Sequence, residues 1–217
     1  MSLLPRRALS LEGNTLTAQV GSDTYVYTKS DVSFANGAYR HITVKMRPMS
    51  APDATSLSNV TSDHIGQVVG ANGLVYTNAA AATSAGTTAV AMIAYVREKG
   101  HGLAIALADE PEKYGYSFSA AFTVASNKTP KVEGGTWQLP LMADWVNMAS
   151  ASGCGAYTTI NAKLESAGGT KLVDDYWAPE SQYDSYYTIY FSDEMDDYPF
   201  GIGSELGSNK VRACLSF

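Results

Sequence analysis

The stretch 137–147, Trp-Gln-Leu-Pro-Leu-Met-Ala-Asp-Trp-Val-Asn, decides the fold class of this chain. Pro140 suits the first position of a helix, because the amide N–H that proline lacks has no partner there. The residues that follow place apolar side chains on one helical face: Leu141, Met142, Trp145, Met148 and Ala149. We therefore predict a helix over 140–150 that packs on a sheet.

Upstream of this helix, the sequence predicts a shorter helix and two strands. Residues 78–84 are rich in alanine and are followed by Gly86, which is typical of a helix and its stop. The runs 88–96 and 102–107 are almost continuously apolar, which is the composition of buried strands. These strands supply the sheet on which the helices are expected to pack.

Downstream, a third helix is expected over 159–166, with Thr158 as its cap and two glycines at 168–169 ending it. Strand signals separated by polar turns fill residues 172–217. This order of elements predicts an α+β fold in which two or three short helices pack on antiparallel sheets.

Residues 7–47 have the alternating polar and apolar pattern of strands, with Gly13-Asn14 marking a turn. The segment 47–58 contains two prolines and several small residues, so it is typical of a linker. We therefore expect a small all-β unit over 1–50 and a larger domain over 51–217.

Composition and charge exclude several functions. The chain has 217 residues, of which 45% are hydrophobic and 17% charged, and its formal net charge is -6. Duplex DNA and anionic membranes are bound through basic patches, so neither nucleic acid nor a membrane surface is an expected partner. Polar residues and glycines interrupt the uncharged run 65–96, which argues against a membrane span. Membrane attachment is expected only through an anchor absent from this chain.

The sequence carries no pattern of catalytic or metal-ligating residues. His41, His64 and His101 lie far apart and far from both cysteines, so no zinc spacing exists. Neither a nucleophile elbow nor a phosphate-binding loop is present. We therefore expect no enzymatic activity, no catalytic residue, no metal and no cofactor.

Two features leave alternatives open. Cys154 and Cys214 are compatible with one disulfide or with two separately buried thiols. The acidic run 193–197 fails the EF-hand register, so it is either a looser calcium site or an acidic loop in solvent.

The segment between Lys171 and Lys210 differs from the rest of the chain. It contains no basic residue but nine acidic residues and six of the 14 tyrosines. Tyrosine mixed with Ser, Asp and Gly is typical of antibody-like binding surfaces, because tyrosine offers a large amphipathic contact with few rotatable bonds. The alternative is that these tyrosines are ordinary strand residues.

Strand alternation helps to separate these two interpretations. Tyr187, Ile189 and Phe191 are expected on one face, and Thr188, Tyr190 and Ser192 on the other, so about half of the aromatic set belongs to the core. The remaining positions define the predicted ligand-binding set: Tyr183, Asp184, Tyr186, Thr188, Tyr190, Glu194, Asp196, Asp197, Tyr198 and Phe200.

Three spaced motifs resemble those of a known family. They are Trp137-Gln138-Leu139-Pro140 with Asp144-Trp145, then Tyr176-Trp177, then Val211-Arg212-Ala213-Cys214. The set resembles the C-type-lectin-like fold in its formylglycine-generating-enzyme-like branch and covers about residues 55–217. Leu141, Asp144 and the stretch 178–180 depart from the usual residues of that family.

The resemblance extends to surface proteins of gut Bacteroidales, and residues 7–47 look like closing strands of a fimbrillin-like or immunoglobulin-like domain. It implies an extracellular or cell-surface location, on a bacterium or borne by a phage. The enzyme of this branch uses closely spaced cysteines, whereas those of this chain stand sixty positions apart. Its chemistry is therefore not implied.

Variable proteins of diversity-generating retroelements use the same lectin-like fold and randomise exposed positions in their last fifty or so residues. This likeness implies a non-enzymatic protein that presents the predicted set to a protein or surface receptor. Its framework is then Trp137, Trp145, Trp177 and Arg212. The alternatives are a pilus or surface-assembly subunit acting as an adhesin and, less favoured, a formylglycine-generating-type enzyme. The oligomeric state stays open.

Overall fold

The structure is a computed structural model of the whole chain. It describes residues 8–12, 15–20, 23–28, 47–48, 54–112, 114–180, 186–191, 200–202 and 207–217. The chain divides into two units, Met1–Pro52 and Asp53–Phe217.

The first unit contains a four-stranded antiparallel sheet in the order β1-β2-β3-β4. Its strands are β1 (Ala8–Glu12), β2 (Thr15–Val20), β3 (Asp23–Thr28) and β4 (Arg47–Pro48). Leu11 pairs with Leu16, so the alternating stretches on either side of 13–14 form the expected hairpin. The strand pattern at 40–46 lies outside the described residues.

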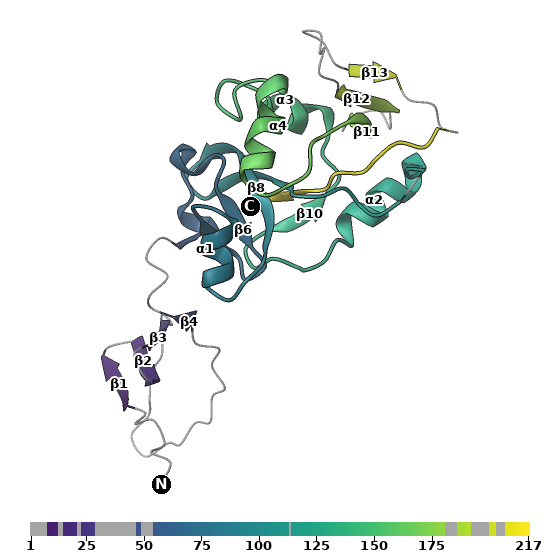
Figure 1. Ribbon diagram of the computed structural model, residues 1–217. Coiled ribbons are helices and arrows are strands. Elements are labelled where there is room, and N and C mark those ends of the chain that lie inside the picture. The colour runs from purple at the N-terminus through teal and green to yellow at the C-terminus, as the bar shows by residue number, and fades with distance from the viewer. Residues whose placement is uncertain are drawn as a thin grey trace. The chain divides into compact units, whose positions relative to one another are not determined.

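A seven-stranded antiparallel sheet forms the centre of the second unit (Figure 1). Its order is β10 (Thr136–Gln138), β14 (Cys214–Ser216), β9 (His101–Ala106), β8 (Ala89–Glu98), β6 (Val68–Gly70), β7 (Leu74–Tyr76) and β5 (Thr55–Ser56). Strands β8 and β9 confirm the two predicted apolar strands. The last strand of the chain, β14, lies between β9 and β10, so distant parts of the sequence meet there.

The described residues contain four α-helices rather than two or three: α1 (Ala79–Ser84), α2 (Phe118–Ser126), α3 (Met142–Met148) and α4 (Tyr157–Ser166). Helix α2 was not predicted. Its aromatic and β-branched residues are weak helix formers, and its start depends on the Ser117 side chain, which accepts a hydrogen bond from the Ala120 N–H at 3.4 Å. Two short 3-10 helices, Leu57–Asn59 and Ser62–His64, follow β5.

Two predicted helix starts are wrong by a few residues. Helix α3 begins at Met142, two residues after Pro140, because the Asp144 carboxylate accepts the Leu141 N–H at 3.0 Å. Helix α4 begins at Tyr157 rather than after Thr158. The Thr159 hydroxyl accepts the Ala156 N–H at 2.9 Å, so Thr159, not Thr158, closes this end.

A separate three-stranded antiparallel sheet has the order β11 (Asp174–Trp177), β12 (Tyr187–Phe191) and β13 (Phe200–Ile202). Lys210 ties it to the rest of the unit, because its N–H donates to Asp175 O at 2.9 Å and its carbonyl accepts the Trp177 N–H at 3.2 Å. The second unit is therefore α+β with mostly antiparallel strands, as predicted.

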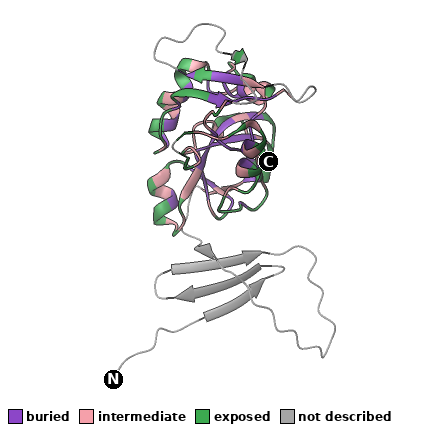
Figure 2. Ribbon diagram, turned by 90° about the vertical axis from the view of Figure 1, so that its right-hand side faces the viewer, coloured by how far each residue is buried: buried purple, intermediate pink, exposed green. Residues whose placement is uncertain are grey.

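Buried residues of this unit line its strands, while exposed residues gather on its helices and loops (Figure 2). Trp145, Trp177 and Arg212 are 0% exposed and Trp137 is 2% exposed. We call these four residues the buried framework. Full burial of three indoles and a guanidinium makes the unit sensitive to change at these positions.

Candidate ligand-binding surface

The three-stranded sheet brings the two halves of the acidic and tyrosine-rich segment together. In register across its strands, Trp177 pairs with Thr188, and Thr188 pairs with Gly201. Two residues away on each strand, Asp175 pairs with Tyr190. Because side chains alternate along a strand, Trp177, Thr188, Asp175 and Tyr190 share one face of this sheet.

The opposite face of the sheet belongs to the core. Ile189 and Phe191 are buried there, as the alternation predicted. The Phe191 ring lies 5.4 Å from Trp145 and 5.9 Å from Tyr176 between ring centroids, and 6.4 Å from Tyr157. Helices α3 and α4 therefore cover this face with aromatic side chains.

Thr188 does not belong to an exposed surface, so its place in the predicted ligand-binding set is wrong. Its side chain is 5% exposed although it lies on the face opposite the core aromatics. Trp177 and Gly201 flank it on the neighbouring strands, and its hydroxyl hydrogen-bonds the Asp175 carboxylate. A Cβ on Gly201 would lie only 3.3 Å from the Thr188 hydroxyl oxygen. Alternation predicted the face correctly, but not that this face is also covered.

Tyr190 is the exposed aromatic residue of β12. It is 49% exposed, whereas both of its neighbours in the strand are buried. It pairs with Asp175, an exposed carboxylate on the adjacent strand. The Tyr190–Asp175 pair is the described part of the candidate surface that faces solvent.

Tyr186 marks the other end of this face and is half-buried. Its ring contacts Phe118 on α2 with centroids 4.7 Å apart. Phe118 also contacts Trp177 at 5.4 Å and Phe122 at 5.2 Å. Helix α2 therefore covers the Trp177 end of the face and leaves the Tyr190 end open.

The rest of the predicted set lies outside the described residues. These are Tyr183, Asp184, Glu194, Asp196, Asp197 and Tyr198. Phe200 belongs to β13 and pairs with Ile189 through its backbone, but its side chain is outside the description.

The carboxylates at the start of β11 are held by specific contacts. Partial burial raises the pKa of Asp175 above its usual value and the negative charge of Asp174 adds to this, whereas the hydrogen bond from Thr188 lowers it. Asp174 has a φ of 68°, a left-handed conformation that aspartate tolerates better than most residues. The Lys210 ammonium lies 2.8 Å from the Asp174 carboxylate and donates to Val173 O at 3.1 Å. These contacts fix the strand end that presents Asp175.

Arg212 anchors the segment that links Lys210, which bonds to β11, to β14. Its Nε donates to the Asp109 carboxylate at 2.6 Å, and its other donors reach Ala106 O, Thr170 O, the Thr170 hydroxyl and Lys171 O at 3.1 to 3.3 Å. The Tyr176 hydroxyl donates to the same carboxylate at 3.1 Å, and burial raises the pKa of Tyr176 to about 12. Asp109 and Thr170 were not predicted, because nothing local in the sequence distinguishes them.

Both cysteines are buried free thiols, which answers the question that their spacing left open. The Cys154 Sγ donates to Ala94 O at 3.6 Å. Burial raises the pKa of Cys154 to about 11, and burial and the charge of Asp144 raise that of Cys214. Neither thiol is activated as a nucleophile.

We therefore expect both thiols to be inert in the native chain. Because the raised pKa values keep the thiolate scarce below about pH 11, iodoacetamide at pH 8 should leave Cys154 and Cys214 unmodified. After unfolding in guanidinium, both should react. Mass spectrometry of the native and the unfolded sample counts the modified cysteines. Rapid labelling of either cysteine in the native chain would contradict the expectation that both thiols are inert.

Metal-binding clusters and membrane-spanning helices are both absent from the described residues. Among them, no group of three or more His, Cys, Asp or Glu side chains is arranged to hold a metal ion. The acidic run 193–197 and His41 lie outside that part of the chain. No described helix combines the length and apolar character needed to cross a bilayer.

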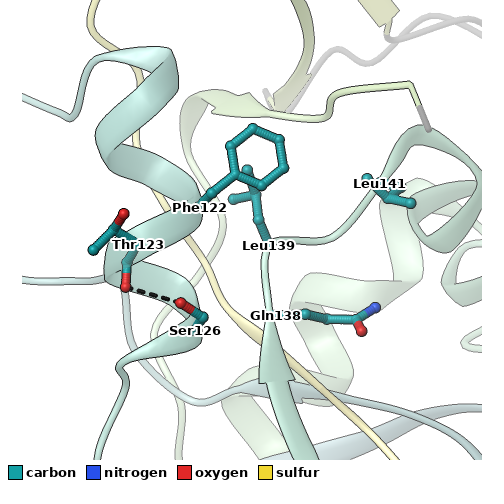
Figure 3. Close-up of a pocket in the computed structure, with 6 residues that line it drawn as sticks. All are labelled: Phe122, Thr123, Ser126, Gln138, Leu139 and Leu141. Carbon is teal, nitrogen blue, oxygen red and sulfur yellow. Dashed lines mark hydrogen bonds between the residues drawn. The ribbon is translucent and has the colours of Figure 1, made fainter. Parts of the chain in front are cut away.

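A shallow groove of about 390 Å³ opens between α2 and the segment that leads from β10 into α3 (Figure 3). Its lining residues are Phe122, Thr123, Ser126, Gln138, Leu139 and Leu141. Phe122 projects from α2 toward Leu139 and is 39% exposed. The groove therefore begins where the Tyr186–Phe118–Phe122 ring contacts end.

Comparisons of the chain with protein-family models, with curated proteins and with solved structures each give no match.

Proposed function

We propose that this chain is a non-enzymatic binding protein. It presents a tyrosine- and aspartate-rich surface, built on β11, β12 and β13, to a protein or surface receptor. The observation that carries the proposal is Tyr190, a half-exposed tyrosine between two buried residues of a core strand, paired with the exposed Asp175. An aromatic side chain held by a rigid strand loses little conformational entropy on binding.

The rest of the predicted set is proposed to extend this surface. Its members lie just before β12, within β12 or β13, or between these two strands in the chain. They are therefore connected to the same three-stranded sheet. Tyrosines supply apolar contact area, and the carboxylates select basic or hydrogen-bond-donating partners. Thr188 is excluded from the surface and acts as a support for Asp175.

The scaffold is proposed to be C-type-lectin-like. In support, all four residues of the buried framework lie in the second unit, and each motif that carries the resemblance has a structural position there. The Trp137 motif runs from β10 into α3, Tyr176-Trp177 ends β11, and Val211-Arg212 leads into β14. A buried framework next to an exposed set is what a variable protein of a diversity-generating retroelement requires.

The genomic neighbourhood tests this last step. We expect a near-identical repeat of the 3′ end of the gene, differing only at adenines, beside a reverse transcriptase gene. The differing codons should be those of exposed positions such as Tyr190, and the codons of Trp177 and Arg212 should match the repeat. Differences spread equally over both classes, or the absence of such a repeat, would remove the retroelement proposal and leave a binding protein of fixed sequence.

Replacing Tyr190 by alanine should barely change stability. Because the side chain is half-exposed, we expect the free energy of unfolding to fall by less than about 1 kcal/mol. Phe191→Ala, one residue away in the same strand, is the matched control and should cost about 3 to 5 kcal/mol. Urea unfolding followed by circular dichroism measures both. Equal losses would mean that Tyr190 is a structural residue, contrary to the proposal.

A further inference from the structure

Three aromatic rings extend the candidate surface onto α2. Tyr186 contacts Phe118, and Phe118 contacts Phe122 one helical turn further along α2. Phe118 also packs edge-on against Trp177, which fixes this row to the buried framework. We call Tyr186, Phe118 and Phe122 the aromatic strip.

The groove at the end of the aromatic strip has a second wall, opposite α2, and this wall is tied to the three-stranded sheet. Its Leu141 wall directly precedes Met142, whose N–H donates to Pro179 O at 2.9 Å, just beyond the end of β11. One wall therefore comes from α2 and the other is held against the three-stranded sheet. The groove and the aromatic strip share α2, and Tyr186 of the strip lies on the same face of the three-stranded sheet as the Tyr190–Asp175 pair.

The chemistry of the groove favours an apolar side chain. Phe122, Leu139 and Leu141 form its apolar walls. Two of its polar side chains already have partners: the Ser126 hydroxyl donates to Thr123 O at 3.1 Å (Figure 3), and the Gln138 amide donates to the Asp144 carboxylate at 3.2 Å. A polar ligand would have to replace these bonds, whereas an apolar side chain would only displace water.

The other end of the surface favours a cation. Lys210 is already paired with Asp174 at 2.8 Å, so Asp175 is the exposed carboxylate of the described strand end without that counter-charge. The segment between Lys171 and Lys210 carries nine acidic residues and no basic one. At the described strand end itself, the two carboxylates of Asp174 and Asp175 face the single ammonium of Lys210, so the net charge there is negative and attracts basic groups.

We infer that the partner is a polypeptide that places an apolar side chain in the groove of Phe122, Leu139 and Leu141 and a lysine or arginine at Asp175. This inference rests on the proposed binding function and names the chemistry of its partner. The aromatic strip beside the groove supplies further apolar contact.

A phage-displayed library of random 12-residue peptides, selected on the full-length chain, is the probe. We expect enriched peptides to combine Leu, Met or an aromatic residue with Lys or Arg. Capture of these peptides should fall about tenfold or more for Phe122→Ala and for Asp175→Asn, because each change removes one anchor. Val146→Ala and Glu98→Gln are matched controls, an exposed valine on α3 and an exposed carboxylate on β8, and should leave capture unchanged.

Leu141→Asn is a second test of the groove that preserves the fold. Residue 141 is the cap of α3, where asparagine is favoured, so the helix keeps its start while the groove loses an apolar wall. Thermal unfolding of each variant checks that it is folded, and capture should again fall about tenfold.

The outcomes separate the two proposals. Capture that is lost with Tyr190→Ala but unchanged with Phe122→Ala and Leu141→Asn would overturn the groove and leave the binding function standing. Enriched peptides without basic residues, or indifferent to Asp175→Asn, would overturn the cation site. No enrichment above the unselected library, or capture indifferent to every variant, would overturn both proposals.

Discussion

Replacing Trp177 by alanine is expected to lower the free energy of unfolding by about 3 to 5 kcal/mol. The indole is fully buried, its Nε1 donates to Tyr116 O at 2.7 Å, and its ring packs edge-on against Phe118. The truncation leaves a cavity between α2 and the three-stranded sheet and removes one of the two donors to Tyr116 O, which keeps only the Asn209 N–H. Urea unfolding of the full chain, followed by circular dichroism, measures the loss.

A comparison with Trp145 sharpens this test. Trp145 is equally buried, but its Nε1 has no hydrogen-bond partner in the described part of the chain. Trp177→Phe should therefore cost about 1 kcal/mol more than Trp145→Phe, because only the first loses a hydrogen bond. Val146→Ala, at a side chain 47% exposed on α3, is the surface control. If Trp177→Ala costs no more than this control, the indole does not anchor the sheet.

The second large effect is expected at Arg212. Arg212→Met should cost about 3 to 5 kcal/mol, because it leaves the Asp109 carboxylate and three carbonyls without their buried donor. Arg212→Lys should recover only part of the loss, since an ammonium has three donors and cannot reproduce the planar fork. Thermal and urea unfolding of the three proteins provide the comparison.

The Asp109 carboxylate supplies the control for this prediction. If the cost of Arg212→Met arises from an orphaned charge, Asp109→Asn should cost less in the Arg212→Met background than in the unaltered chain. Additive effects would show that Arg212 and Asp109 act independently. An Arg212→Met variant as stable as the unaltered chain would contradict the assignment of Arg212 to the buried framework.

Local sequence patterns predicted the elements that have long apolar runs or clear start and stop residues. Strands β8 and β9 are long apolar runs, and α1 lies between an asparagine cap and Gly86. Helix α2 was missed because Phe, Thr and Val dilute its helical pattern. The three-residue strands β6 and β7 are too short to show a period.

The site was predictable only in part, because burial depends on distant segments. Alternation separates Thr188 from Ile189, but it does not reveal that α2, from a much earlier part of the chain, brings Phe118 against Trp177 on the Thr188 side. The Asp109 partner of Arg212 lies 103 positions away and has no local signature. Tyr190 was predicted as exposed and is exposed, because it stands at the end of β12 that α2 leaves open.

The central claim is that one set of residues holds the fold while a different, exposed set binds. A substitution scan of residues 171–217 in the full-length chain tests it. Protease resistance and capture of the enriched peptides are measured for every variant. We predict that changes at Tyr190 and Asp175 reduce capture while resistance stays intact, and that changes at Trp177, Thr188 and Arg212 abolish resistance. Loss of resistance at Tyr190 and Asp175 equal to that at Trp177, or capture that follows resistance at every position, would contradict the account.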